Sequence, residues 1–224
     1  MSISHEIIAR IEARPMLSHP FYQAWTAGTL SKDALRAYAE QYFRHVDAFP
    51  RYVSSVHAGC DDLGVRKALL ANLVEEEQGP DDHPTLWLRF AAALGASEAD
   101  VRAAAAWPET TALVDAFFDL TKRGTWRQGL AALLAYESQV PGVARAKIDG
   151  LAKFYGIDAA RDVQFFTAHL EADELHAATE RDLLDRHATD AEREALLAAA
   201  ERARDALWGF LDGALRASNA AAAA

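Results

Sequence analysis

The sequence is poor in cysteine, in long apolar runs and in excess positive charge. Its one cysteine, Cys60, cannot form a disulfide within the chain, which fits a reducing compartment. The start, MSISHEIIARIEARP, is charged and amphipathic, so we expect neither a signal peptide nor a membrane span, and the cytoplasm is the default location. The net charge of −10 argues against a surface for nucleic acid or anionic membranes, since both require clustered Lys and Arg.

Signals for strands, repeats and interdomain linkers are missing as well. No run alternates apolar and polar residues over the length of a strand, and no Pro-, Gly- or Ser-rich stretch divides the chain. What is present is an ordinary globular composition, 51% hydrophobic and 25% charged, over 224 residues. Because this length is ample for one large core, the sequence predicts a single domain.

Apolar residues recur every three or four positions in almost every segment, as amphipathic helices require. Within residues 31–49 the recurring positions are Leu35, Tyr38, Tyr42, His45 and Phe49. We expect Pro50 to bend or end that helix. Further helices are expected over 62–79, from 97, over 108–124, over 125–155 with a bend at Pro141, over 158–187 and over 190–216. The sequence therefore predicts an all-α bundle of about seven or more helices.

The octet HLEADELH, residues 169–176, places two histidines and three acids in a short helical segment. At about 100° per residue, His169, Asp173 and His176 fall at about 0°, 40° and −20° on one face. Glu171 and Glu174 lie off that face and can be solvated. Because Asp is almost never buried unpaired, this stripe indicates a metal site, although a polar surface stripe would have the same pattern.

Candidate partners for the octet occur in two other segments. Glu76 and His83 are seven residues apart, about two turns on one face if the helix is continuous. Alternatively, Gly79–Pro80 breaks that helix and His83 opens the next one. Glu137 follows LAALLAY, an apolar stretch that a bundle must bury, and a buried carboxylate requires a cation or several hydrogen bonds. A purely structural role explains Glu137 least well.

Together these positions supply three carboxylates and three imidazoles: Glu76, His83, Glu137, His169, Asp173 and His176. Such a set is typical of a non-haem dinuclear centre, where carboxylates neutralise two divalent ions and positions stay open for dioxygen. Two divalent ions against three carboxylates leave about +1, which is better than three buried anions without a metal. Structural zinc is disfavoured because it uses four ligands, usually with cysteine.

The pattern E-x6-H, then E within YES, then H-x3-D-x2-H resembles the haem-oxygenase-like di-metal oxidases. More narrowly, it resembles the family of the chlamydial protein associating with death domains, over residues 15–215. The resemblance implies a single haem-oxygenase-like helical domain, which we assign to residues 1–216. The end of the chain, ASNAAAA, is of low complexity, so we expect a tail over 217–224 without a role in the fold.

The same resemblance implies that the protein makes 4-aminobenzoate, a folate precursor, from one of its own tyrosines. It implies Tyr22 as the residue consumed, Tyr38 and Tyr136 near the metals, and Lys147 as the amino donor. O2 and an external reductant would be co-substrates. Lys147 follows Glu137 by ten residues, about −80° on a straight helix, so it can border the same cavity. On the residues alone, the tyrosines are core aromatics and Lys147 is a surface lysine with a buried stem.

Several other polar residues are expected to have no part in a site. His45 lies on the apolar face beside Tyr42 and is expected to be a hydrogen-bonded core histidine. Glu75 and Glu77 are expected to be a solvated acidic run. Cys60 has no evident base in HAGCDD, so it does not match the nucleophile of the thiaminase-like branch of this fold. No partner spacing distinguishes the remaining histidines, His5, His19, His57 and His187.

Two other functions stay open. The same centre can oxidise an external small molecule, as other oxidases of this fold do, and an apolar access channel would favour that function. A non-enzymatic protein-interaction module is the third hypothesis, but six buried ligands are costly to desolvate without a metal. The sequence determines neither the metals, Fe/Fe or Mn/Fe, nor the assembly, for which a homodimer is one option.

Overall fold

The computed structural model describes residues 2–222, without the side chains of Glu171, Ala221 and Ala222, and this part of the chain contains eleven α-helices and no strand. The predicted all-α class is therefore confirmed. The helices are α1 (Ile3–Glu12), α2 (Pro20–Ala27), α3 (Lys32–Gly59), α4 (Leu63–Glu77), α5 (His83–Ala93), α6 (Glu98–Ala103), α7 (Pro108–Phe118), α8 (Trp126–Glu137), α9 (Val140–Gly150), α10 (Gln164–His187) and α11 (Arg193–Ala222).

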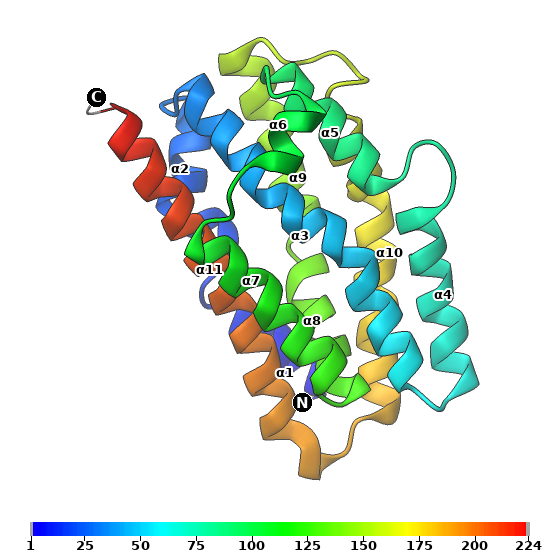
Figure 1. Cartoon of the computed structure of the whole chain (residues 1–224). Helices are drawn as coiled ribbons and strands as arrows, with labels where there is room; N and C mark the ends of the chain where they lie inside the picture. The colour runs from blue at the N-terminus through cyan, green and yellow to red at the C-terminus, as the bar shows by residue number, and fades with distance from the viewer. Residues whose placement is uncertain (1, 223–224) are drawn as a thin grey trace.

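Helix α8 is the centre of the bundle. It packs against α1, α3, α10 and α11, and every residue from Gly129 to Glu137 is buried. Figure 1 shows α4 and α10 side by side along one edge of the bundle and α11 along the opposite edge. None of the described helices is both long and apolar enough to cross a membrane. Because α8 is buried up to its last residue, Glu137 lies inside the protein.

Several helix boundaries follow the signals in the sequence. Ser31 caps α3 by accepting a hydrogen bond from the backbone N–H of Ala34. Ser97 and Asp100 form a capping box at the start of α6. Helix α7 begins at Pro108, and Gly124 ends the π-helical turn that follows it. These positions confirm the expected starts and stops.

Other boundaries differ from the sequence expectations. Helix α3 continues through Pro50 to Gly59, because Pro50 is buried among neighbours whose packing offsets its missing N–H. The chain leaves the helix at residues 138–139, so Pro141 lies in the first turn of α9 instead of bending a continuous helix. Helix α10 begins at Gln164 because turns occupy residues 160–162. Helix α11 runs through 217–222 of the expected tail, and 223–224 lie outside the described residues, as does the expected solvation of Glu171.

The break at Gly79–Pro80 decides how Glu76 and His83 approach each other. Helix α4 ends at Glu77, and α5 begins at His83 after Asp82 caps it. The two residues therefore lie on different helices, which is the second of the two alternatives above. Their separation depends on how α4 and α5 pack and no longer on helical spacing.

Helices α2 and α9 touch through glycine, and this close approach holds the segment that carries Lys147. A Cβ on Gly150 would lie 2.7 Å from Trp25 Cδ1 and 3.0 Å from its Nε1. The indole Nε1–H also donates to the carbonyl of Lys147 at 3.4 Å.

Gly150→Ala is expected to destabilise the protein by about 1–3 kcal/mol, because neither the Trp25 ring nor the helix backbone can yield easily. Gly209→Ala in α11 is the matched control. No atom lies within 4 Å of its added Cβ, so it should stabilise the fold by about 0.4–1 kcal/mol. Urea unfolding measures both values, and equal effects would contradict the close packing of α2 on α9.

Candidate metal centre

The six predicted ligands converge inside the bundle from α4, α5, α8 and α10, and all six are buried. They form two groups in which one ligand atom of each residue lies within 4.8 Å of the others. The first group consists of Glu76, His83 and His169, and the second of Glu137, Asp173 and His176. A cavity of about 10 Å³ is lined by members of both groups. Each group has the size of one ion site, and the two adjoin.

In the first group, the histidine nitrogens meet the pattern of metal-binding imidazoles. Nδ1 of His169 lies 2.6 Å from the carbonyl oxygen of Phe165, which orients the ring and leaves Nε2 for a ligand. Nδ1 of His83 lies 2.8 Å from Oε2 of Glu76, yet it makes no hydrogen bond. The two atoms therefore lie side by side, as ligands of a common ion would.

In the second group, one nitrogen of His176 faces the carboxylates and the other faces outward. Its Nδ1 lies 3.4 Å from Oε1 of Glu137 and 3.7 Å from Oδ1 of Asp173. Its Nε2 lies 3.1 Å from Oε2 of Glu75, whose side chain is 44% exposed. Asn72 Nδ2 donates to Oε1 of Glu137 at 3.0 Å. Glu75 is therefore exposed, as the sequence predicts, and it also contacts a buried imidazole of the cluster.

Buried atoms without partners show that these residues fit metal ions. Among the described residues, hydrogen-bond partners are missing for Nδ1 of His83, Oε2 of Glu137, Oδ2 of Asp173 and both nitrogens of His176. Buried polar atoms are nearly always paired, so several orphans in one place indicate an absent partner. Carboxylate oxygens and imidazole nitrogens are donors that divalent transition metals accept.

The charges of the cluster are strongly coupled. Burial raises the pKa of Asp173 to about 7, and the charges of Glu137 and Glu76 add to that shift. Burial alone would lower the pKa of His176, but Asp173 and Glu137 outweigh it and raise the value to about 10. The metal-free cluster therefore holds protons that offset its negative charges. Metal cations can replace those protons.

Lys147 lies beside two of the predicted tyrosines. Its Nζ donates to the hydroxyl of Tyr38 at 2.7 Å, and the hydroxyls of Tyr38 and Tyr22 are 3.2 Å apart. Lys147 is only 4% exposed, so the alternative of a surface lysine is wrong. Burial lowers the pKa of its amine to about 7.

A second small cavity connects this cluster to the ligands. Its volume is about 10 Å³, and its lining includes Tyr22, Tyr136, Lys147 and His169. Tyr136 also lines the cavity between the two ligand groups. Tyr38 lines neither cavity and contacts the site through Lys147, Tyr22 and Tyr42. Tyr136 therefore lies next to the predicted ligands, whereas Tyr38 lies outside both cavities and contacts Lys147.

The sequence pattern alone did not indicate a role in the site for four residues of this region: Tyr42, Asn72, Glu75 and Glu180. The hydroxyl of Tyr42 donates to that of Tyr136 at 3.1 Å, and its ring stacks on Tyr38 with centroids 5.4 Å apart. Tyr42, Asn72 and Glu180 each lie four residues, about one helical turn, from a predicted site residue, namely Tyr38, Glu76 and His176. The i, i+4 spacing could therefore have indicated these three residues from the sequence.

The residues expected to be structural lie apart from the ligands. His45 is buried as expected, but neither ring nitrogen has a hydrogen-bond partner among the described residues, so the expected hydrogen bonds are absent. Burial among aromatic rings lowers its pKa to about 3 and keeps it neutral. Burial raises the pKa of the Cys60 thiol, which keeps it unreactive. His19 caps α2 through a hydrogen bond from the N–H of Phe21.

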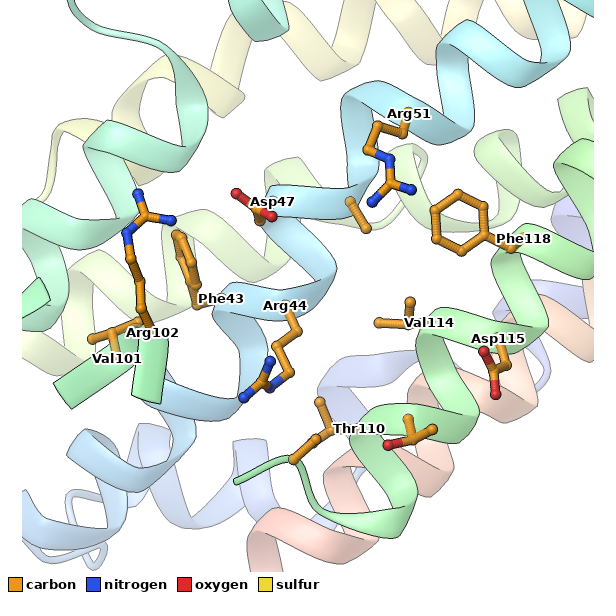
Figure 2. A pocket seen from close by; sticks show the side chains of 13 residues that line it. Phe43, Arg44, Asp47, Arg51, Val101, Arg102, Thr110, Val114, Asp115 and Phe118 are labelled. Atoms are coloured by element: carbon orange, nitrogen blue, oxygen red, sulfur yellow. The ribbon is translucent and has the colours of Figure 1, made fainter. Parts of the chain in front are cut away.

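Three larger pockets open on the surface, and one of them, of about 540 Å³ beside Trp126, has none of the predicted site residues in its lining. Figure 2 shows another of about 430 Å³ between α3 and the α6–α7 segment, with Arg44, Arg51 and Arg102 in its lining and none of the predicted site residues. The third, also about 430 Å³, is lined in part by Glu137 and Asp173. Of the three, only this last pocket approaches the ligand groups.

Comparison with known proteins agrees with this architecture. The profile of a family described as "Iron-containing redox enzyme" matches residues 36–208. The 4-aminobenzoate synthase of Nitrosomonas europaea is 45% identical over 95% of this chain and 90% of its own length. That of Chlamydia muridarum is 40% identical over 96% and 91%. A CADD-like protein of unknown function from Nostoc punctiforme superposes with a TM-score of 0.79 at 16% identity, over 98% of this chain and 95% of that chain, which shows a common fold.

Lys147→Met is expected to stabilise the metal-free protein at pH 6 and to have little of this effect at pH 10. The pKa of Lys147 falls from 10.5 to about 7 on folding, so below pH 7 the fold carries the full cost of a buried charge. That cost, of order a few kcal/mol, declines as pH rises from about 7 towards 10.5.

Urea unfolding of the two proteins at both pH values measures the effect. Lys67→Met, at an exposed position of α4, is the control and should change little between the two conditions. A Lys147→Met difference that is the same at pH 6 and pH 10 would contradict a buried, titrating amine.

Proposed function

Since this chain belongs to the family of iron-containing redox enzymes, we propose that it forms 4-aminobenzoate from its own Tyr22, with Lys147 as the amino donor. The product follows the names of the relatives at 40–45% identity. The observation that carries the self-consuming reaction is a buried Lys147 in one small cavity with Tyr22 and the predicted ligand His169.

The size of that cavity supports an internal substrate. At about 10 Å³ it has room for one molecule the size of water, and an added aromatic ring does not fit. An aromatic ring is already present as Tyr22, which is 3% exposed. The ring and Cβ of a tyrosine contain all the carbon atoms of 4-aminobenzoate. No external carbon source is then required.

The surroundings of Lys147 suit an amine that acts as a nucleophile. With a pKa of about 7, a large part of the amine is neutral near neutral pH and has a free electron pair. Its Nζ lies 5.3 Å from the ring centroid of Tyr22, and the hydrogen bond to Tyr38 holds it there. Tyr38 is thus best described as a residue that positions Lys147.

The two ligand groups would hold one ion each, Glu76, His83 and His169 the first, and Glu137, Asp173 and His176 the second. Such ions, when bound and reduced, supply with O2 the oxidising power that a phenol requires. Fe/Fe and Mn/Fe both satisfy this mixed nitrogen and oxygen donor set. Electrons come from an external reductant. Tyr136 lines both small cavities, the one between the ligand groups and the one that contains Tyr22.

Oxidation of an external small molecule is the second candidate function. The pocket of about 430 Å³ beside Glu137 and Asp173 favours it, because this pocket is large enough for such a substrate. Neither Tyr22 nor Lys147 lines that pocket. External oxidation would therefore leave the buried lysine without a role, which is why we rank it second.

Removal of a ligand should remove metal. Glu137→Ala and His169→Ala are each expected to reduce bound iron or manganese from two equivalents to about one or fewer, since each deletes a donor of one group. Elemental analysis of protein loaded anaerobically with Fe²⁺, with and without Mn²⁺, measures the content. Glu174→Gln, at an exposed position of the same helix as His169, is the control. Unchanged content in both alanine variants would reject the ligand assignment.

The origin of the product atoms tests the self-consuming reaction. Protein grown with ring-labelled tyrosine is expected to release ring-labelled 4-aminobenzoate in unlabelled buffer that contains excess free tyrosine. Product should not exceed one molecule per chain. Tyr22→Phe should lose most of the product because it lacks the oxidisable O–H, and Lys147→Arg should lose it while keeping metal, since a guanidinium stays protonated. Mass spectrometry of the product measures its label and its amount, and mass spectrometry of the protein measures the loss of the tyrosine side chain. Many turnovers per chain, or label from added small molecules, would favour the second candidate.

A further inference from the structure

Glu180 is a buried carboxyl group that the six ligands leave unexplained. It is 2% exposed, and in its ionised form neither of its oxygens has a hydrogen-bond donor among the described residues, because its close polar neighbour is the carboxyl group of Glu137. It follows His176 by one helical turn on α10, and the spacing of 169, 173, 176 and 180 places all four on one helix face. Its side chain therefore projects from the same face as the predicted ligands.

The groups that face Glu180 are acidic. Burial raises its pKa, and the charge of Glu137, a hydrogen bond to that carboxyl group and the charge of Asp173 raise it further. No Lys or Arg in the described part of the chain forms an ion pair with it. A buried carboxyl beside two others costs stability, and an apolar residue of similar size would avoid that cost. A bound cation is the partner that would make this arrangement favourable.

We propose, as an extension of the dinuclear centre above, that Glu180 is its fourth carboxylate and serves the ion held by Glu137, Asp173 and His176. Four carboxylates neutralise two divalent ions completely, which a buried centre favours over a net charge. The two ion sites then differ in kind. The first has one carboxylate and two imidazoles, whereas the second has one imidazole and is otherwise built from carboxylates.

Titration of metal-free protein with Mn²⁺ alone, followed by electron paramagnetic resonance of the free ion, tests this role. Wild type is expected to bind two ions, and Glu180→Gln should weaken one of the two sites tenfold or more and leave the other unchanged. Glu174→Gln, exposed on the same helix, is the control and should bind as wild type does. Two ions in wild type with unchanged affinities in Glu180→Gln would overturn the role of Glu180 and leave the proposed function intact. Fewer than two ions in wild type would instead overturn the dinuclear centre itself.

Thermal unfolding of Glu180→Leu separates a metal role from a structural one. If Glu180 serves an ion, the metal-free variant melts higher than wild type, because a buried unpaired carboxyl is gone, while the rise in Tm on adding Mn²⁺ is smaller. A lower Tm without metal, combined with an undiminished rise on adding Mn²⁺, would mean that Glu180 only supports the fold, and the proposal would be wrong.

Discussion

The centre of this bundle contains more ionisable groups than an apolar interior tolerates, and the surrounding architecture is organised around that fact. Carboxyl groups of Glu76, Glu137, Asp173 and Glu180 meet imidazoles inside the protein, with several atoms lacking hydrogen-bond partners. Burial of such a set is unfavourable unless cations or protons compensate it. The fold therefore trades stability without metal for the capacity to hold metal, as expected of a site that is kept for chemistry.

The helices divide this task between them. Helix α10 presents four of the groups along one face, and α4, α5 and α8 each bring one or more from the opposite sides. Helix α8 is buried along most of its length, so Glu137 at its end enters the cluster without crossing a surface layer. Glu75 and Asn72 then contact His176 and Glu137 from α4. Such outer partners orient ligands and adjust their basicity.

The surroundings of Lys147 lie next to the cluster and differ from it, because they consist of aromatic rings instead of charged groups. Lys147 is surrounded by aromatic rings, among them Tyr22, Trp25 and Trp87, at 5.3–5.7 Å from its Nζ. Burial among these rings excludes water, and this desolvation lowers the pKa of the amine to about 7. A small cavity lined by both Lys147 and His169 links these surroundings to the predicted ligands. An acidic cluster and a nearly neutral amine thus adjoin across one layer of tyrosines.

The sequence by itself determined the features that depend on local spacing. Helical periodicity predicted the all-α class and the shared face of His169, Asp173 and His176, because 3.6 residues per turn set these directions within one helix. Residue type predicted the cap at Ser97 and the helix start at Pro108. Only the tertiary structure decided which of the predicted ligands lie together, that Pro50 lies within a continuous helix, and that Lys147 is buried. It also brought Glu180 against Glu137. Such distances between helices follow from the packing of side chains far apart in the chain, which a periodicity cannot encode.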